Sequence, residues 1–496
     1  MTGMSADQPM WPGAWDRPVA AIETHISVLV FVGDRVYKAL KPVRTGFLDH
    51  STAAARRRAA EAELALNRRL APDVYLGLLE VDDGAGPTEP VIAMRRMPTD
   101  RRLAALVAAG DGADCVRAVA RTLAAFHAAA PGTAAIRAAA TPGAVWELWR
   151  DNAAGLRQAG RGIVDAEALA DADLRAREYV LGRAALFEAR IAAGRIRDGH
   201  GDVLADDIFC LPDGPRILDC LAFDDRLRHG DVLADVGFLA MDLERLGRAD
   251  LAGRLLDWYR EFSFERHPAS LAHYYVAYRA QIRAKVACLR AAQGGEGAAE
   301  EARRLLEISL GRLRRAEVRL VLVGGPPGSG KSALSRALSR QTGATLLRSD
   351  ELRKDLAGLA HDASGRAPLG EGIYRADMTE AVYEELGRRA ERLLELGESV
   401  ILDASWGSEP ARERARRLAA SARARVVELR CEAPAALADQ RVVARSGGER
   451  AGSDATLEVA RAMRASFDAW PSATTVDTAG TVAAAASAGA EAFGAH

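Results

Sequence analysis

The chain has 496 residues, a formal net charge of −1 and 27% charged residues. This length is enough for about two to four domains, each able to bury a core of its own. The balanced charge argues against a general nucleic-acid binder, which would normally carry a basic excess. The sequence has no apolar run of about 18 residues or more, so we expect no membrane span.

Two further features bear on the compartment. The N-terminal residues lack the basic region followed by an apolar region that marks a secretory signal. The cysteines are scattered without any CxxC spacing, so we expect reduced thiols in a cytoplasmic protein. The cysteines are Cys115, Cys210, Cys220, Cys288 and Cys431.

Residues 20–100 are predicted to form a small β-rich lobe. Alternating apolar residues flank Gly33-Asp34, which predicts a hairpin at that turn. Residues 101–195 and 231–315 are rich in Ala, Leu and Arg and predict helices. The lobe's expected elements are the strands Val28–Val32, Arg35–Leu40, Val74–Val81 and Pro90–Arg95 and a helix from about Ser51 to Leu70.

The segment between the two helical regions carries a cluster of acids. His200-Gly-Asp202 is followed five residues later by Asp207, and a short strand then leads to Asp219. This is the order of a protein-kinase-type catalytic loop and its metal-binding aspartate. Asp202 is the candidate base that accepts the proton of a substrate hydroxyl. Asp207 and Asp219 are the candidate Mg²⁺ ligands, and we expect His200 to support the loop rather than react.

These motifs belong to a wider resemblance. Several N-terminal segments resemble the aminoglycoside-phosphotransferase-like kinases, in particular bacterial two-domain proteins in which such a domain precedes a P-loop kinase. The resemblance covers nearly the whole chain. It implies that Lys38 pairs with the inner ATP phosphates and that Glu63, or its neighbour Glu61, holds Lys38 in place. The segments are Glu23–Ser27, Val36–Lys38, Lys41–Asp49 and Leu66–Asp73.

The same resemblance makes Asp235 the helix aspartate that ties down the catalytic loop, with an exposed helix charge as the alternative. Two positions depart from the family pattern. Asp207 stands where these kinases usually have Asn, and Ala222 stands where related sequences often have Glu. No glycine-rich loop precedes Lys38 to cover the phosphates. The N-terminal site is therefore expected to have a kinase fold, while its efficiency as a kinase stays open.

The second half opens with a phosphate-binding loop. An apolar strand at Arg319–Val323 leads into Gly325-x-x-x-x-Gly-Lys331-Ser332, and a helix follows. In this setting backbone N–H groups turn toward phosphate oxygens, the lysine reaches the outer phosphates and the serine hydroxyl binds Mg²⁺. The predicted nucleotide-binding residues here are Gly325, Pro326, Pro327, Gly328, Ser329, Gly330, Lys331 and Ser332.

Downstream, strands alternate with helices, which predicts a parallel sheet covered on both faces. Ser349-Asp350 and Arg353 resemble the substrate segment of the gluconate-kinase and chloramphenicol-phosphotransferase relatives, with Asp350 as base; a helix N-cap is the alternative. Asp403, at the end of an apolar strand, is a candidate Mg²⁺ ligand or an ordinary strand-end aspartate. Arg441 and Arg445 precede Gly447-Gly448 and would close on the transferring phosphate as part of a lid; in a chain so rich in arginine, a solvated surface is the alternative for either of them.

The sequence thus predicts an α+β bilobal kinase-like domain at 20–312 (small lobe 20–100, large lobe 101–312). A P-loop kinase domain of α/β fold is predicted at 317–496. We expect an ATP- and Mg²⁺-dependent phosphotransferase acting on a hydroxyl of a small molecule such as a sugar, amino sugar or aminoglycoside. No guanine-reading Asn-Lys-x-Asp motif is present, which favours ATP over GTP. We expect neither nucleic acid nor membrane as a partner. The alternatives are a nucleotide-binding regulatory protein and an acceptor-independent ATPase.

Overall fold

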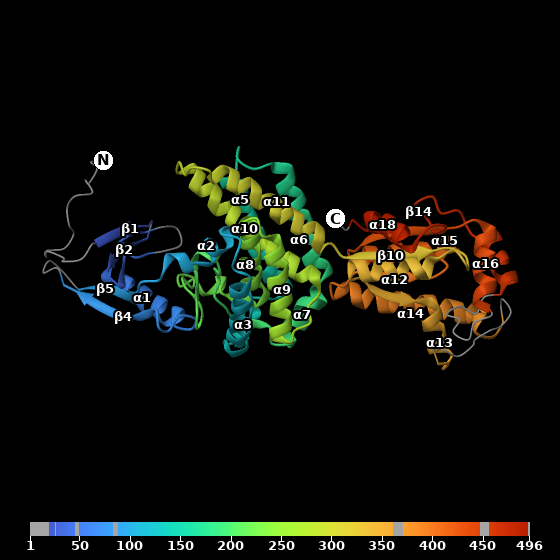
Figure 1. Cartoon of the computed structure of the whole chain (residues 1–496), viewed down its shortest axis with the longest axis horizontal. Coiled ribbons are helices and arrows are strands. Elements are labelled where there is room, and N and C mark those ends of the chain that lie inside the picture. Colours follow the sequence, from blue (N-terminus) through green and yellow to red (C-terminus); the bar gives the residue numbers. More distant parts are fainter. Residues whose placement is uncertain are drawn as a thin grey trace. The chain divides into compact units, whose positions relative to one another are not determined.

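A computed structural model of the chain describes residues 19–494 apart from 25, 45–48, 83–87, 361–370 and 447–455 (Figure 1). Its contacts divide the chain into two compact units. The first comprises the described residues up to Ala139 together with Ile196–Glu265. The second comprises Ala140–Arg195 and the described residues from Arg266 onward. Among the described residues, no helix combines the length and apolar character needed to cross a bilayer.

The first unit contains a five-stranded antiparallel sheet in the order β1-β2-β3-β5-β4. The predicted hairpin is present, with Gly33 at a φ of 58°, a value that glycine tolerates best. One helix, α1 (Ala53–Asn67), packs against β4 and β5. Apolar side chains such as Ile92 and Val74 fill the core. The strands are β1 (Val19–Glu23), β2 (Ser27–Val32), β3 (Arg35–Leu40), β4 (Tyr75–Val81) and β5 (Glu89–Arg95).

Helices and two small two-stranded sheets, β6-β9 and β7-β8, complete the first unit. The strands β7 and β8 pair as a hairpin that carries Asp207 just before it and Asp219 just after it. The elements are α2 (Leu103–Ala108), α3 (Ala113–Ala129), α4 (Ala134–Ala138), β6 (Ile196–Asp198), β7 (Ile208–Leu211), β8 (Gly214–Ile217), β9 (His229–Asp231), α8 (Leu233–Arg245) and α9 (Ala249–Ser263).

A disulfide joins Cys115 on α3 to Cys210 on β7. The expectation of reduced thiols was therefore wrong for these two residues. A disulfide needs two Cα atoms that lie roughly 4.4–6.8 Å apart. These lie 5.8 Å apart, and sequence spacing does not reveal such a tertiary approach. The other three cysteines are free and buried.

The second unit is built around a five-stranded sheet in the order β11-β12-β10-β13-β14, in which every pair is parallel. Successive side chains point to opposite faces. Val321 and Val323 pack under α12 (Lys331–Thr342) and α18 (Val482–Phe493). Leu320 and Leu402 line a pocket under α14 (Ala376–Glu395) and α15 (Glu409–Ser421). The strands are β10 (Arg319–Gly324), β11 (Thr345–Arg348), β12 (Val400–Asp403), β13 (Arg425–Glu432) and β14 (Thr474–Asp477).

Helices cover both faces of this sheet, as predicted from the strand–helix alternation. The helices that follow or connect its strands are α12 (Lys331–Thr342), α13 (Ser349–Leu356), α14 (Ala376–Glu395), α15 (Glu409–Ser421), α16 (Ala435–Ser446), α17 (Leu457–Ala465) and α18 (Val482–Phe493). The observed sheet and its helices, together with the antiparallel lobe of the first unit, confirm the predicted fold class.

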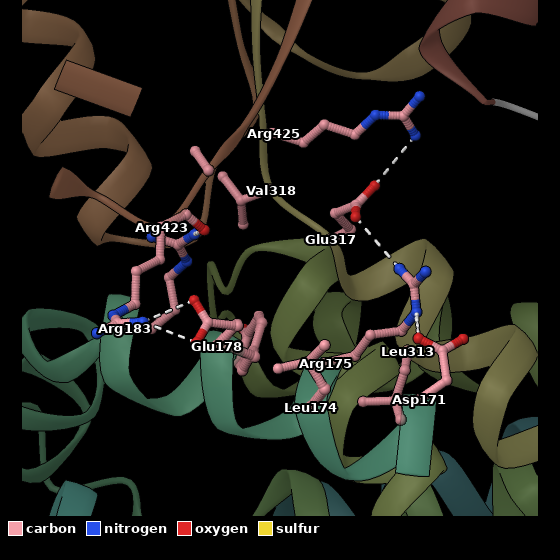
Figure 2. A pocket seen from close by; sticks show the side chains of 12 residues that line it. Asp171, Leu174, Arg175, Glu178, Arg183, Leu313, Glu317, Val318, Arg423 and Arg425 are labelled. Carbon is pink, nitrogen blue, oxygen red and sulfur yellow. Dashed lines mark hydrogen bonds and ion pairs between the residues drawn. The ribbon is translucent and has the colours of Figure 1, made fainter. Parts of the chain in front are cut away.

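A layer of five further helices belongs to the same unit. Near the beginnings of β10 and β13 this layer leaves a pocket of about 340 Å³ (Figure 2). Arg175 on α6 lies between Asp171 and Glu317, and Glu317 also pairs with Arg425. The predicted domain boundary at residue 317 stays a prediction. The five helices are α5 (Pro142–Ala159), α6 (Ala166–Gly182), α7 (Ala184–Ala192), α10 (Ala269–Ala292) and α11 (Ala298–Ala316).

Candidate active site

The first candidate site begins with a lysine on β3. Lys38 Nζ donates to Glu63 Oε1 at 2.7 Å and lies 3.6 Å from Asp219 Oδ1. Glu63 is buried on α1 while Glu61 is exposed, so of these two glutamates it is Glu63 that meets Lys38. Desolvation alone would lower the pKa of Lys38, but the carboxylates of Glu63 and Asp219 outweigh it and raise that pKa. Lys38 therefore keeps its charge, as a phosphate ligand requires.

The catalytic-loop segment is held by a buried aspartate on α8. Asp235 accepts the backbone N–H groups of His200 at 2.6 Å and Gly201 at 2.9 Å. A Cβ at Gly199 would come within 2.4 Å of Asp235 Oδ2, so the chain approaches this carboxylate more closely than another residue would allow. Asp235 is 3% exposed, which rules out the alternative of an exposed helix charge.

His200 acts as a structural support within this loop. Its Nδ1 accepts the N–H of Asp202 at 3.3 Å, and its Nε2 lies 3.1 Å from the carbonyl oxygen of Leu218. One nitrogen must accept and the other donate, so the ring is the neutral Nε2–H tautomer. Burial lowers the pKa of His200 to about 4, which agrees with a neutral ring.

Three aspartates influence one another electrostatically at this site. The pKa of Asp207 is raised well above its usual value, first by desolvation and then by the charges of Asp219 and Asp202. A divalent cation would relieve this repulsion, so Asp207 and Asp219 fit a Mg²⁺ site. Within the described parts of the chain, no group of three or more acids, histidines or cysteines could hold a metal by itself. Mg²⁺ commonly uses one or two carboxylates and completes its shell with phosphate oxygens and water.

The second candidate site is the loop between β10 and α12. Gly328 and Gly330 have φ values of 85° and 87°. A Cβ at Gly328 would lie 2.3 Å from the carbonyl oxygen of Ala438, so this turn accepts only glycine without a shift of backbone. The hydroxyl of Ser329 is buried without a hydrogen-bond partner in the structure. A loop of this shape, ending at the N-terminus of α12, fits the phosphates of a nucleotide.

Beside the loop, two adjacent strands end in charged residues. Asp403 at the end of β12 lies opposite Arg348 at the end of β11. Arg348 Nε donates to Asp403 Oδ2 at 3.2 Å and its guanidinium also pairs with Glu351. The other carboxylate oxygen of Asp403 is buried without a hydrogen-bond partner. A carboxylate that is held through one oxygen, with the other oxygen unbonded, fits Mg²⁺ or one of its waters. A strand-end aspartate without a ligand role gives no reason for an unbonded buried oxygen.

Asp350 lies on the first turn of α13. The helix begins at Ser349, so neither Ser349 nor Asp350 occupies the N-cap position, and the capping alternative is wrong. The pKa of Asp350 is raised, first by desolvation, while Lys331 opposes the shift and Asp403 adds to it. A raised pKa makes the carboxylate a better proton acceptor near neutral pH. Arg353 donates to the Ile373 carbonyl oxygen at 2.9 Å, which ties α13 to the segment before α14.

Arg441 contacts the phosphate loop directly. Its guanidinium donates to the carbonyl oxygens of Gly328 at 3.4 Å and Thr478 at 2.7 Å. Thr478 Oγ1 in turn donates to the Ser329 carbonyl oxygen at 2.6 Å. Sequence reasoning missed Thr478, because only its tertiary position links it to the loop. Arg445 lies on α16, where its side chain is outside the described residues, and Gly447-Gly448 also lie outside them.

Comparison with known proteins extends these observations. The model of the AAA domain family matches residues 320–470. A protein of Mycobacterium tuberculosis strain H37Rv and one of Mycobacterium bovis, both described as uncharacterized, are each 44% identical over 470 residues, covering 94% of this chain and 93% of theirs. The chain belongs to the family of these two proteins. The matched residues extend over both units of this chain.

Solved structures of kinases are also similar. A choline/ethanolamine kinase family protein from Mesorhizobium loti is 16% identical, with 62% of this chain and 96% of that chain covered at a TM-score of 0.38. A gluconokinase from Sinorhizobium meliloti 1021 is 17% identical, with 36% and 98% covered at a TM-score of 0.26. The fold rests on the strand order above rather than on these scores.

Proposed function

We propose that the protein is an ATP-dependent phosphotransferase that moves the γ-phosphate of ATP to a hydroxyl of a small molecule. One observation carries the proposal. The phosphate loop, the carboxylate of Asp350 and the oriented carboxylate of Asp403 converge at the carboxyl ends of β10, β11 and β12. Ligands of open parallel sheets bind at this edge, where neighbouring strand ends meet.

The residues suggest a division of work in the second unit. Lys331 and the loop N–H groups would bind the outer phosphates, and Ser332 and Asp403 would hold Mg²⁺, which supplies positive charge to the transferring phosphate. The acceptor oxygen forms its bond to the γ-phosphorus as the bond from that phosphorus to the bridging oxygen of ADP breaks. The acceptor proton passes to Asp350, whose raised pKa suits a base. In the first unit Asp202 would take the same role.

The acceptor class follows from the sequence resemblance, which points to sugars, amino sugars or aminoglycosides. The net charge of −1 gives no basic excess of the kind that a nucleic-acid acceptor would favour.

A second function is favoured by the crowded acids of the first unit. The charges of Asp219 and Asp202 raise the pKa of Asp207, so this carboxyl is harder to ionise than an ordinary aspartate. A site that binds metal weakly could sense nucleotide without efficient transfer. In that case the first unit would regulate the P-loop unit, or the protein would hydrolyse ATP without an acceptor.

ADP release with Mg²⁺ and ATP, measured across a panel of sugars, amino sugars and aminoglycosides, tests these functions. Wild type is compared with Asp202→Ala and Lys331→Ala. We expect one acceptor to stimulate turnover and one of the two variants to lose that stimulation, which assigns the reaction to its unit. Rapid hydrolysis that no acceptor changes would favour the ATPase, and nucleotide binding without turnover would favour the regulatory protein.

A further inference from the structure

Asp219 has an unusual backbone conformation. Its φ is 63°, in the left-handed region that residues with a Cβ seldom occupy. Such a conformation costs free energy and persists only where neighbouring groups hold it. Because Asp219 has no bulky or β-branched side chain, the free-energy cost of this conformation is moderate. Neighbouring contacts must still stabilise it.

Two buried side chains supply those contacts. Asn67 Oδ1 accepts the N–H of Cys220 at 2.8 Å, and Tyr75 Oη accepts the N–H of Asp219 at 3.4 Å. Asn67 is 1% exposed and Tyr75 is 2% exposed. The N–H groups of Asp219 and Cys220, which flank the Asp219 Cα, therefore both donate to side chains from other elements of the fold.

Asn67 is also fixed to the helix that carries it. Its Nδ2 donates to the carbonyl oxygen of Glu63 at 2.9 Å, so both ends of the amide are used. Glu63 lies four residues earlier on α1, and residues at this spacing share one face of a helix. The same face therefore holds Lys38 through the Glu63 carboxylate and the Cys220 peptide through Asn67.

We propose that Asn67, together with the Tyr75 hydroxyl, is a positioning residue that couples α1 to the metal-binding aspartate: the two side chains hold Asp219 in the left-handed conformation that places its carboxylate beside Lys38. The inference rests on the proposed nucleotide-binding role of the first unit. Asn67 itself touches neither metal nor nucleotide. Its loss should weaken Mg²⁺ binding while leaving the Lys38–Glu63 ion pair in place.

Calorimetric titration of ATP at a series of Mg²⁺ concentrations provides the first test. All proteins carry Lys331→Ala, so that the P-loop no longer dominates binding. Asn67→Leu keeps the side-chain size and removes both hydrogen bonds, and Tyr75→Phe removes only the hydroxyl. We expect the Mg²⁺ concentration for half-maximal ATP binding to rise at least roughly tenfold in Asn67→Leu, as when support for a metal ligand is lost. ATP affinity without Mg²⁺ should change by less than about twofold.

The matched control is Asn152→Leu. Asn152 is likewise buried and donates to Gln281, but it lies on α5 in the other unit. It should leave the Mg²⁺ requirement unchanged. If Asn67→Leu does not fold, Tyr75→Phe carries the same test. The proposal would be overturned if a folded Asn67 or Tyr75 variant had an unchanged Mg²⁺ requirement. It would also be overturned if ATP affinity fell equally with and without Mg²⁺.

A second readout needs neither metal nor nucleotide. Cys220 is a free, buried cysteine in the held segment, and Cys288 and Cys431 are free, buried references in the other unit. Iodoacetamide labelling followed by peptide mass analysis should show Cys220 reacting several-fold faster in Asn67→Leu, with the two reference rates unchanged. Equal rates at Cys220 in wild type and variant would contradict the proposal. If the Lys331→Ala protein binds no ATP at any Mg²⁺ concentration, the nucleotide-binding role of the first unit fails, and with it the inference.

Discussion

His200 in the catalytic loop supports the structure through its hydrogen bonds as a neutral ring, and not through a charge. It accepts from the Asp202 N–H and donates to the Leu218 carbonyl oxygen. A protonated imidazole would have to turn a donor toward the Asp202 N–H, which is itself a donor. The ring is 1% exposed, so no water can relieve this conflict. Folding therefore selects the neutral form.

This selection predicts a pH dependence of stability. The pKa of His200 is lowered from about 6.5 in an unfolded chain to about 4 in the folded one. The unfolded state therefore binds the proton more readily, and the stabilisation present above pH 6.5 is lost as the pH falls toward 4. The loss should reach about 2 kcal/mol near pH 5.

Urea unfolding of wild type and His200→Gln near pH 7 and near pH 5 measures this loss. Glutamine can accept and donate in the same places but does not titrate. The variant should lose about 2 kcal/mol less than wild type between the two pH values. The same loss in both proteins would show that His200 is not the group responsible.

At the scale of the element, the C-terminal helix shows where sequence reasoning reached its limit. The last twenty residues are rich in Ala, Gly and Thr, and their composition predicts no particular structure. In the structure β14 and α18 close one side of the P-loop sheet, and Ala486, Ala490 and Phe493 are buried against it. Gly489 is in close contact with Leu338 of α12, where a Cβ would lie 3.1 Å from its side chain. Small residues here allow close helix packing, a property of the tertiary structure.

The packing of α18 predicts a large effect for one substitution. Phe493 is 7% exposed and belongs to the core of the P-loop sheet. Phe493→Ala should lower the free energy of unfolding by about 3 kcal/mol, because it removes buried apolar area and leaves a cavity. Tryptophan fluorescence, to which the buried Trp406 and Trp470 contribute, reports this unfolding. Phe264→Ala, at a side chain that is 93% exposed, should change it by less than about 0.5 kcal/mol. Equal effects of both substitutions would mean that α18 does not stabilise the sheet.

The elements that could be predicted from the sequence are those with a local signal. The strand Arg35–Leu40 and the phosphate loop were both expected where they occur, because a turn glycine or a motif spacing acts over a few residues. The resemblance left Glu63 and Glu61 as possible partners of Lys38. The rotation of α1 about its axis, which turns Glu63 inward and Glu61 to solvent, decides between them. Thr478 and the Cys115–Cys210 bond join residues distant in sequence, and a single sequence carries no signal for such pairs.

At the scale of the whole molecule, a buried arginine joins the helical layer to the P-loop sheet within the second unit. Arg183 follows α6, and its guanidinium donates to the carbonyl oxygens of Gly182 at 2.6 Å, Ala422 at 2.8 Å and Arg423 at 3.1 Å. These carbonyls lie at the ends of α6 and α15, where helix dipoles concentrate negative potential. Burial lowers the pKa of Arg183 to about 10, so it remains charged at neutral pH. The helix ends thus supply its hydrogen-bond acceptors, and the charge of Glu395 partly offsets the effect of burial on its pKa.

The P-loop part should therefore depend on helices that precede it by more than a hundred residues. Arg183→Met keeps a long apolar side chain but leaves those carbonyls unpaired, which should cost about 3 kcal/mol of unfolding free energy. Arg150→Met, at an exposed arginine on α5, should cost less than about 0.5 kcal/mol. A fragment of residues 317–496 lacks Arg183 altogether and should unfold at lower urea than the same residues in the full chain, as followed by Trp406 and Trp470 fluorescence. If the fragment unfolds at the urea concentration of the full chain, and Arg183→Met behaves like Arg150→Met, then the helical layer adds no stability and residue 317 is a true folding boundary.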